Sequence, residues 1–179
     1  MGLGFVVNID HAGLFWGEFQ SRLLQVLLLL RERELVVITT KRPYPDIAVQ
    51  FMYMESGILL CEFPGNEVLA PEARLDEAGL DVMRSFGYRA PRVASECYWE
   101  MAVELPVSTA VLERVATGFM TYLRDLHGVS SPEFLMYRSW RDREVPERGV
   151  FYTDEELEEL DPGEYPLKQD LGLDMEPDL

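Results

Sequence analysis

The hydrophobic pattern of the chain begins with a helix over residues 15–31, where apolar residues recur at intervals of three and four. Leu24 and Leu28 lie outside this apolar stripe. A helix that is apolar on more than one side is covered twice, either within its own domain or by a second subunit. We expect a second subunit, and therefore a homodimer in which Leu24 and Leu28 form the contact. The stripe consists of Phe15, Phe19, Leu23, Val26, Leu27 and Leu30.

Three strands are predicted next, over residues 35–40, 47–54 and 58–63. The first is a β-branched run, which is typical of strands. Between the second and third, Glu55-Ser56-Gly57 places a glycine where a three-residue hairpin requires a positive φ. Strands that follow one another through such short turns pair antiparallel.

A helix, a strand and a further helix complete the predicted domain. Asp76 can cap a helix over residues 76–86, and Gly87 supplies its left-handed end. Residues 97–105 alternate between apolar and polar, which predicts a strand. The last strong helix begins near Ser108 and ends at Gly128. The order α-β-β-β-α-β-α predicts an α+β fold, an antiparallel sheet flanked by helices, and excludes a Rossmann fold.

The two faces of the predicted sheet differ in composition. One face is strongly apolar and fits the core; it contains Ile47, Val49, Phe51, Tyr53, Leu59, Cys61, Phe63, Trp99, Met101 and Val103. The other mixes methionine, tyrosine, aliphatic residues and glutamate; it contains Gln50, Met52, Met54, Ile58, Leu60, Glu62, Tyr98 and Glu100. Methionine-rich surfaces adapt to varied apolar side chains, and glutamates select arginine or lysine. This predicts a partner-binding site of Gln50, Met52, Met54, Leu60, Tyr98 and Glu100. The alternative is permanent cover by another element or a second subunit.

Charge divides the 179 residues into two parts. The net charge is −16, which disfavours binding to nucleic acid or to an anionic membrane. Residues 150–179 carry eleven of the acidic residues against a single base, Lys168. Pro146 and Gly149 mark the boundary, so we expect one domain over residues 1–145 and an acidic C-terminal tail over 146–179. A capping box of Thr153 and Glu156 predicts one helix turn in the tail, whose composition otherwise favours loose attachment. The chain start lacks a basic signal region, and we expect a cytoplasmic protein.

Candidate catalytic chemistry is sparse. The adjacent Asp10 and His11 could form an acid–base or metal site, although a surface loop before a helix is the interpretation we favour. His127 lies in the last turn of a predicted helix, where the dipole favours a partly charged imidazole. The two cysteines, Cys61 and Cys97, fit small buried residues. No known catalytic or phosphate-binding motif is present, so we expect no catalytic residues, no metal and no cofactor.

Residues 47–140 resemble the TY-Chap family, which is related to type III secretion chaperones and YbjN-like domains. Segments IAVQFMYMESGILLCEFPGNEVL, ARLDEAGLDVMRSFGYRAP and LERVATGFMTYLRDLHGVSSPEFLMY carry the resemblance, together with Tyr98-Trp99. The resemblance implies a secretion-chaperone-like α+β fold, a homodimer and binding of a client polypeptide without catalysis. The sequence departs from those chaperones in showing one clear strand, rather than two, between the second and last helices.

Four functional hypotheses remain. The leading one is a non-enzymatic module that holds an extended or amphipathic segment of a partner protein. A second is regulatory: the tail covers the client surface through Leu157, Leu160, Tyr165 and Leu167. A third is an acidic mimic of nucleic acid that binds a basic protein. The fourth is an enzyme that uses Asp10 and His11.

Overall fold

The computed structural model describes residues 14–91, 97–146 and 149–177. Its fold is α+β, with a six-stranded sheet in the order β4-β3-β2-β1-β5-β6. All neighbouring strands pair antiparallel except β5 and β6, which are parallel. The elements in chain order are α1 (Trp16–Leu29), β1 (Glu34–Thr40), β2 (Ala48–Tyr53), β3 (Ile58–Pro64), α2 (Glu77–Phe86), β4 (Tyr98–Glu104), α3 (Thr109–Met120), β5 (Leu135–Arg141), α4 (Asp154–Glu158) and β6 (Asp174–Met175).

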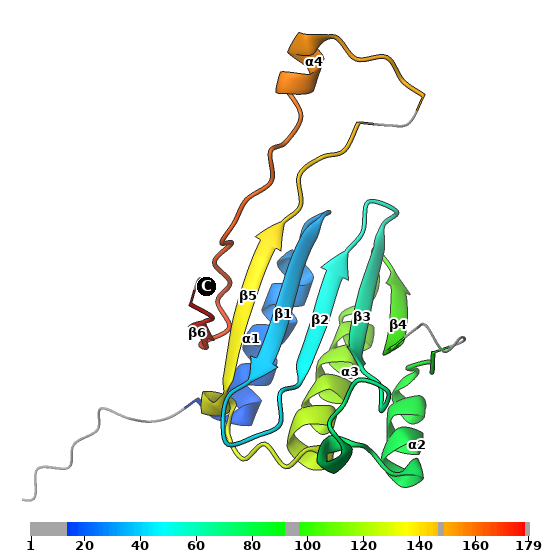
Figure 1. Cartoon of the computed structure of the whole chain (residues 1–179), viewed down its shortest axis with the longest axis vertical. Helices are drawn as coiled ribbons and strands as arrows, with labels where there is room; N and C mark the ends of the chain where they lie inside the picture. The colour runs from blue at the N-terminus through cyan, green and yellow to red at the C-terminus, as the bar shows by residue number, and fades with distance from the viewer. Residues whose placement is uncertain (1–13, 92–96, 147–148, 178–179) are drawn as a thin grey trace, which may run out of the picture.

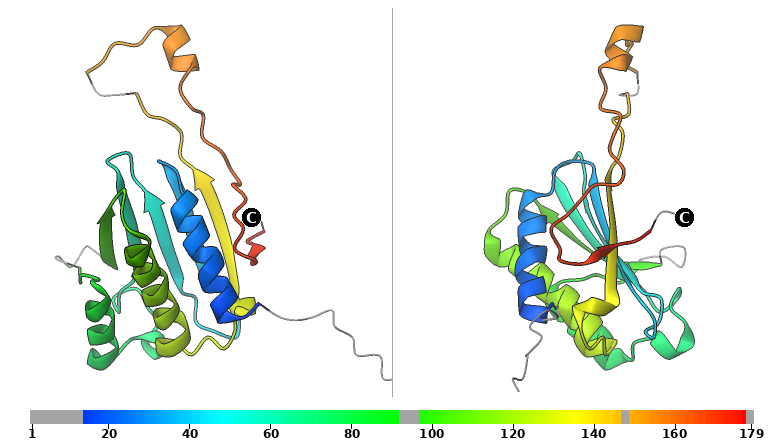
Figure 2. Two further views of the ribbon diagram at one scale, coloured as in Figure 1. Left: turned by 180° about the vertical axis from the view of Figure 1, so that it is seen from behind. Right: turned by 90° about the vertical axis from the view of Figure 1, so that its left-hand side faces the viewer.

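The long helices α1 and α3 lie side by side on one face of the sheet (Figures 1 and 2), and α2 packs beside α3. Phe119 of α3 lies between the two layers: its ring centroid is 6.2 Å from that of Phe19 on α1 and 5.4 Å from that of Phe51 on β2. All three side chains are buried. In the described part of the chain, no helix covers the opposite face of the sheet.

The predicted helices and strands are confirmed, with ends that move by at most two residues outside the last helix. The Asp76 carboxylate accepts a hydrogen bond of 2.9 Å from the Gly79 N–H and so caps α2. Gly57, in the β2–β3 turn, has a φ of 77°, and Gly87, after α2, a φ of 100°. Both glycines therefore adopt the left-handed conformation that the sequence predicts.

The last predicted helix changes its winding before it ends. It is α-helical to Met120 and continues as a π-helical segment, Thr121–Leu126. The His127 N–H donates to the Tyr122 carbonyl at 3.2 Å, the five-residue spacing of a π-helix. This winding coincides with full burial of both Tyr122 and Leu123. The Tyr122 hydroxyl donates to the Pro64 carbonyl at 3.0 Å and so links this segment to the end of β3.

Strand β5 was not expected from the sequence. It pairs with β1 along its whole length, from Glu34 opposite Arg141 to Thr40 opposite Leu135. Strand β1 is therefore central rather than at an edge, which explains why all seven of its residues are buried. The helix–strand order predicted from the sequence lacks both this strand and the short β6.

The C-terminal residues pack against the sheet instead of hanging loosely. After β5 the chain leaves the sheet as an arm (described residues 142–146 and 149–160) that includes α4, and then returns along the outer side of β5 (Figure 1). Residues 161–177, the tail strand, include β6, and Leu171 in this segment is fully buried in the hydrophobic core. The capping box of Thr153 and Glu156 is present at α4. The domain boundary near residue 146 stays a prediction.

Candidate functional site: the open face of the sheet

The sheet surface turned away from α1 and α3, called here the open face, is built from alternate residues of each strand. The strand registers place one apolar row across five strands. Its middle is the least accessible part, since Leu35 is only 8% exposed, whereas Met52 and Leu60 are half-buried. The row runs Ala102, Leu60, Met52, Leu35, Trp140.

A more polar row lies next to it and carries charge of opposite sign at its two ends. Its members are Glu100, Glu62, Gln50, Val37 and Arg138. The Gln50 amide donates to the Glu62 carboxylate, and the Arg89 guanidinium donates to Glu100 at 3.0 Å. On β5 the Arg138 guanidinium lies 5.8 Å from the centre of the Trp140 ring. The β3–β4 end of the open face is thus acidic, and the β5 end is basic.

All six residues predicted for partner binding lie on the open face. The registers pair Gln50 with Glu62 and Met52 with Leu60, and Glu62 and Leu60 pair in turn with Glu100 and Ala102 of β4. Met54 continues the alternation of β2 and is 37% exposed, and Tyr98 at the start of β4 is 44% exposed. The sequence therefore located one continuous surface, although its binding role stays a prediction.

The two predicted dimer residues lie on the other side of the sheet. Leu24 is partly buried against the core, and Leu28 is 43% exposed on α1. The next residue, Leu29, is more exposed still. The end of α1 therefore presents apolar surface at a place that does not compete with the open face.

Sequence reasoning missed the β1 and β5 contributions to the open face, which are Leu35, Arg138 and Trp140. The signal was present, because Leu135, Tyr137 and Ser139 alternate with polar or large residues and all three are buried. The alternating apolar pattern is weak here because one of the inward positions is a serine, Ser139. The Ser139 hydroxyl is satisfied there by donating to the Leu35 carbonyl at 2.8 Å.

The histidines and cysteines offer no catalytic arrangement in the described part of the chain. Burial lowers the pKa of His127 to about 4, so this imidazole is neutral near pH 7 and not partly charged as its helix position predicted. Cys61 is buried, and desolvation raises the pKa of its thiol, whereas Cys97 is half-buried. Asp10 and His11 lie outside the described residues. Among the residues that are described, no cluster of three metal-ligating side chains occurs.

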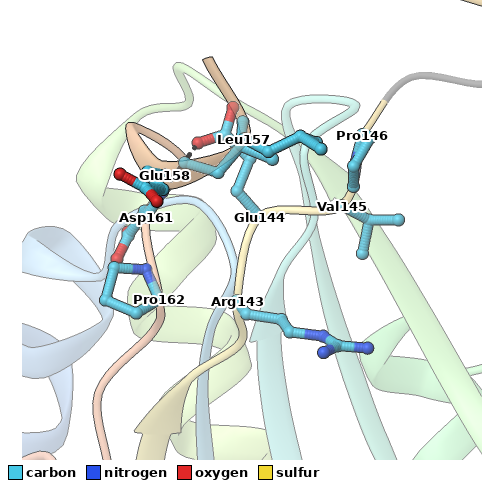
Figure 3. A pocket seen from close by; sticks show the side chains of 9 residues that line it. Arg143, Glu144, Val145, Pro146, Leu157, Glu158, Asp161 and Pro162 are labelled. Carbon is cyan, nitrogen blue, oxygen red and sulfur yellow. Dashed lines mark hydrogen bonds between the residues drawn. The ribbon is translucent and has the colours of Figure 1, made fainter. Parts of the chain in front are cut away.

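A hollow between the two legs of the arm is the clearest alternative site (Figure 3). Leu157 and Pro146 approach each other from opposite legs, while the Arg143 guanidinium points away from Glu158 and Asp161. The hollow is open to solvent and combines apolar side chains with carboxylates. We find no pairing of nucleophile and base among these lining residues.

Comparison with known proteins now identifies the family. A family model described as "T3SS (YopN, CesT) and YbjN peptide-binding chaperone 3", TY-Chap3, matches residues 10–141. No curated protein and no solved structure matches this chain. Within the described residues, no helix is long and apolar enough to cross a membrane. The family match covers more than half of the chain, including α1 and every strand from β1 to β5. The chain belongs to the TY-Chap3 family of peptide-binding chaperone domains.

Proposed function

We propose that this chain is a cytoplasmic, non-enzymatic module that holds an extended or amphipathic segment of a partner protein on its open face. The observation that carries the proposal is the accessible apolar surface around Met52, Met54 and Leu60, which α1 and α3 leave uncovered. The family description, peptide-binding chaperone, supports a protein ligand.

The chemistry of the open face favours a basic and apolar ligand. Met52 and Met54 provide flexible apolar contacts that accommodate side chains of different shape. Glu62 and Glu100 stand beside them and place negative charge at the β3–β4 end. Arginine or lysine flanking an apolar residue would therefore gain both apolar contact and charge pairing.

Methionine-methyl NMR of the full chain tests this proposal. The probe is a synthetic twelve-residue peptide that alternates leucine and arginine. We expect it to shift the Met52 and Met54 methyl resonances, because these side chains reach the open face. The methyl groups of Met83 and Met101 should not move, since both are buried on the helix side of the sheet.

The matched controls vary the ligand charge and the surface. A peptide with glutamate in place of arginine should shift Met52 and Met54 much less. Leu60→Glu should weaken binding of the arginine peptide, whereas Leu157→Glu on the arm should leave it unchanged. Equal shifts with both peptides, or no shift at Met52 and Met54, would overturn the proposal.

We also propose that the protein is a homodimer formed through the outer surface of α1, with Leu24 and Leu28 at the contact. Light scattering should give twice the chain mass, and Leu28→Glu should return the protein to a monomer because it places charge in an apolar contact. Leu157→Glu has the same chemistry at a similarly exposed residue and should remain dimeric. A monomeric wild-type protein at all concentrations would contradict the dimer.

A further inference from the structure

The outer side of β5 is basic, although the protein as a whole is strongly acidic. Five of its sixteen basic side chains lie here, on α1, β5 and the loops next to β1, and each faces an acid of the tail strand. The pairs are Arg22–Asp170 at 2.5 Å, Arg33–Asp161 at 2.8 Å, Lys41–Asp174 at 2.8 Å, Arg138–Glu176 at 3.8 Å, and Arg141 with Asp161 at 2.8 Å and Glu164 at 3.5 Å. Three of these cations also pair with an acid outside the tail strand: Arg22 with Glu18, Arg33 with Glu55 and Arg141 with Glu34. The tail strand supplies an acid to all five, so the charge of this edge is complementary to an acidic segment.

Main-chain hydrogen bonds hold the tail strand against β5 in two stretches, the first antiparallel to β5 and the second parallel to it. The Arg141 N–H donates to the Glu164 carbonyl at 2.9 Å, and the reverse bond is 3.0 Å. Farther along, the Leu167 N–H donates to the Ser139 carbonyl at 2.7 Å. The chain then turns back, and β6 pairs parallel with β5. Backbone pairing of this kind gives affinity to extended peptides, whatever their sequence.

Side chains of the tail strand add selectivity. Leu171 is fully buried, and Leu173 and Met175 pack partly against the core. A hydrogen bond from Lys41 lowers the pKa of Asp174, and the Gly163 N–H followed by Arg141 lowers that of Asp161. Both carboxylates therefore stay charged in the bound strand. The contacts at this edge thus combine charge pairing with the burial of one leucine side chain.

The arm that connects β5 to the tail strand adds little to this packing. Phe151 is 99% exposed, Val145 is 69% exposed, and no described residue of the arm belongs to the buried core. At the base of the arm, the Glu144 N–H donates to the carbonyl of Asp161, the first residue of the tail strand, at 2.8 Å. The arm thus acts as a tether that keeps the tail strand at high local concentration.

We propose that the β5 edge is a docking site for an acidic, leucine-containing segment of a partner protein, and that the tail strand is its intramolecular occupant. This site shares Arg138 with the β5 end of the open face. It differs from the Met52, Met54 and Leu60 surface because it selects ligands of the opposite charge and presents main-chain groups rather than a sheet surface. The inference does not depend on the function proposed above.

The test uses the full chain with a protease recognition sequence inserted beside Phe151 in the arm. The protein is cleaved after folding, and a fluorescent synthetic peptide of residues 161–177 is added. We expect the cleaved protein to exchange its own C-terminal piece for the peptide, because the tether no longer favours the intramolecular strand. The uncleaved chain should take up at least about tenfold less peptide, because the tether keeps its own tail strand at a high effective concentration beside the edge.

Charge variants test whether the edge cations recognise the acids of the peptide. Reversing two of the edge cations, Arg22→Glu with Lys41→Glu, should weaken peptide uptake about tenfold. Arg84→Glu is the matched control, because Arg84 pairs with Glu77 and Asp81 on α2 instead. A peptide in which the acids become asparagine and glutamine should also bind more weakly.

Three results would overturn the proposal. Retention of the C-terminal piece by the cleaved protein until it unfolds would make the tail strand a fixed part of the sheet. Uptake that ignores the charge of the peptide and of the edge would remove the selectivity. Dimers of the uncleaved chain that form by exchange of tail strands would assign the edge to a second copy.

Discussion

Replacing Phe119 by alanine is expected to lower the free energy of unfolding by about 3–5 kcal/mol, the range for a large aromatic side chain deleted from a core. Phe119 is 3% exposed, and its ring meets Phe19 of α1 and Phe51 of β2. The substitution leaves a cavity where both long helices meet the sheet. It should therefore loosen the layer that supports the open face from behind.

Urea unfolding followed by circular dichroism measures this loss. Phe151→Ala makes the same chemical change at a side chain that is 99% exposed, so its unfolding midpoint should match that of the wild type. Equal midpoints for Phe119→Ala and the wild type would show that α3 does not pack on the sheet as described.

Much of this fold follows from local patterns in the sequence. The buried residues of α1 are Phe19, Leu23, Val26 and Leu27, all members of the stripe expected from helical spacing. Alternation likewise predicted which side of β4 is buried, because Trp99, Met101 and Val103 face the helices. These features depend only on the spacing of apolar residues along the chain. That spacing can be read from the sequence without knowing which elements pack together.

Strand β5 shows where local patterns fail. Its inward positions include Ser139, whose buried hydroxyl is satisfied because it donates a hydrogen bond to the Leu35 carbonyl of β1. That partner is more than a hundred residues away in the chain. The β2–β4 part of the open face was consequently found from the sequence, whereas Leu35 and Trp140 were not.

The tail shows a second limit, which concerns charge. Eleven acidic residues in a short segment predict a solvated chain when they are counted by composition. In the fold, Asp161, Asp170 and Asp174 meet cations from α1, β5 and the loops next to β1. Composition cannot reveal such pairing, because the bases that neutralise the acids are scattered along the sequence and converge only at the β5 edge.

Replacing Leu171 by alanine is expected to cost about 2–5 kcal/mol of stability, since this side chain is fully buried although it lies in the acidic tail. Leu157→Ala, on the arm, removes the same atoms from a side chain that is 43% exposed and should cost much less. Thermal unfolding of the two variants beside the wild type provides the comparison.

A second measurement distinguishes undocking of the tail strand from unfolding of the whole domain. Lys168 lies in the tail strand, three residues before Leu171, and offers trypsin a cleavage site there. If the tail strand docks as a separable unit, Leu171→Ala should speed cleavage at Lys168 while the sheet remains folded, because only the docking equilibrium is weakened. Unchanged cleavage together with unchanged stability would contradict the burial of Leu171. Simultaneous loss of tail and sheet would instead show that the sixth strand is inseparable from the other five.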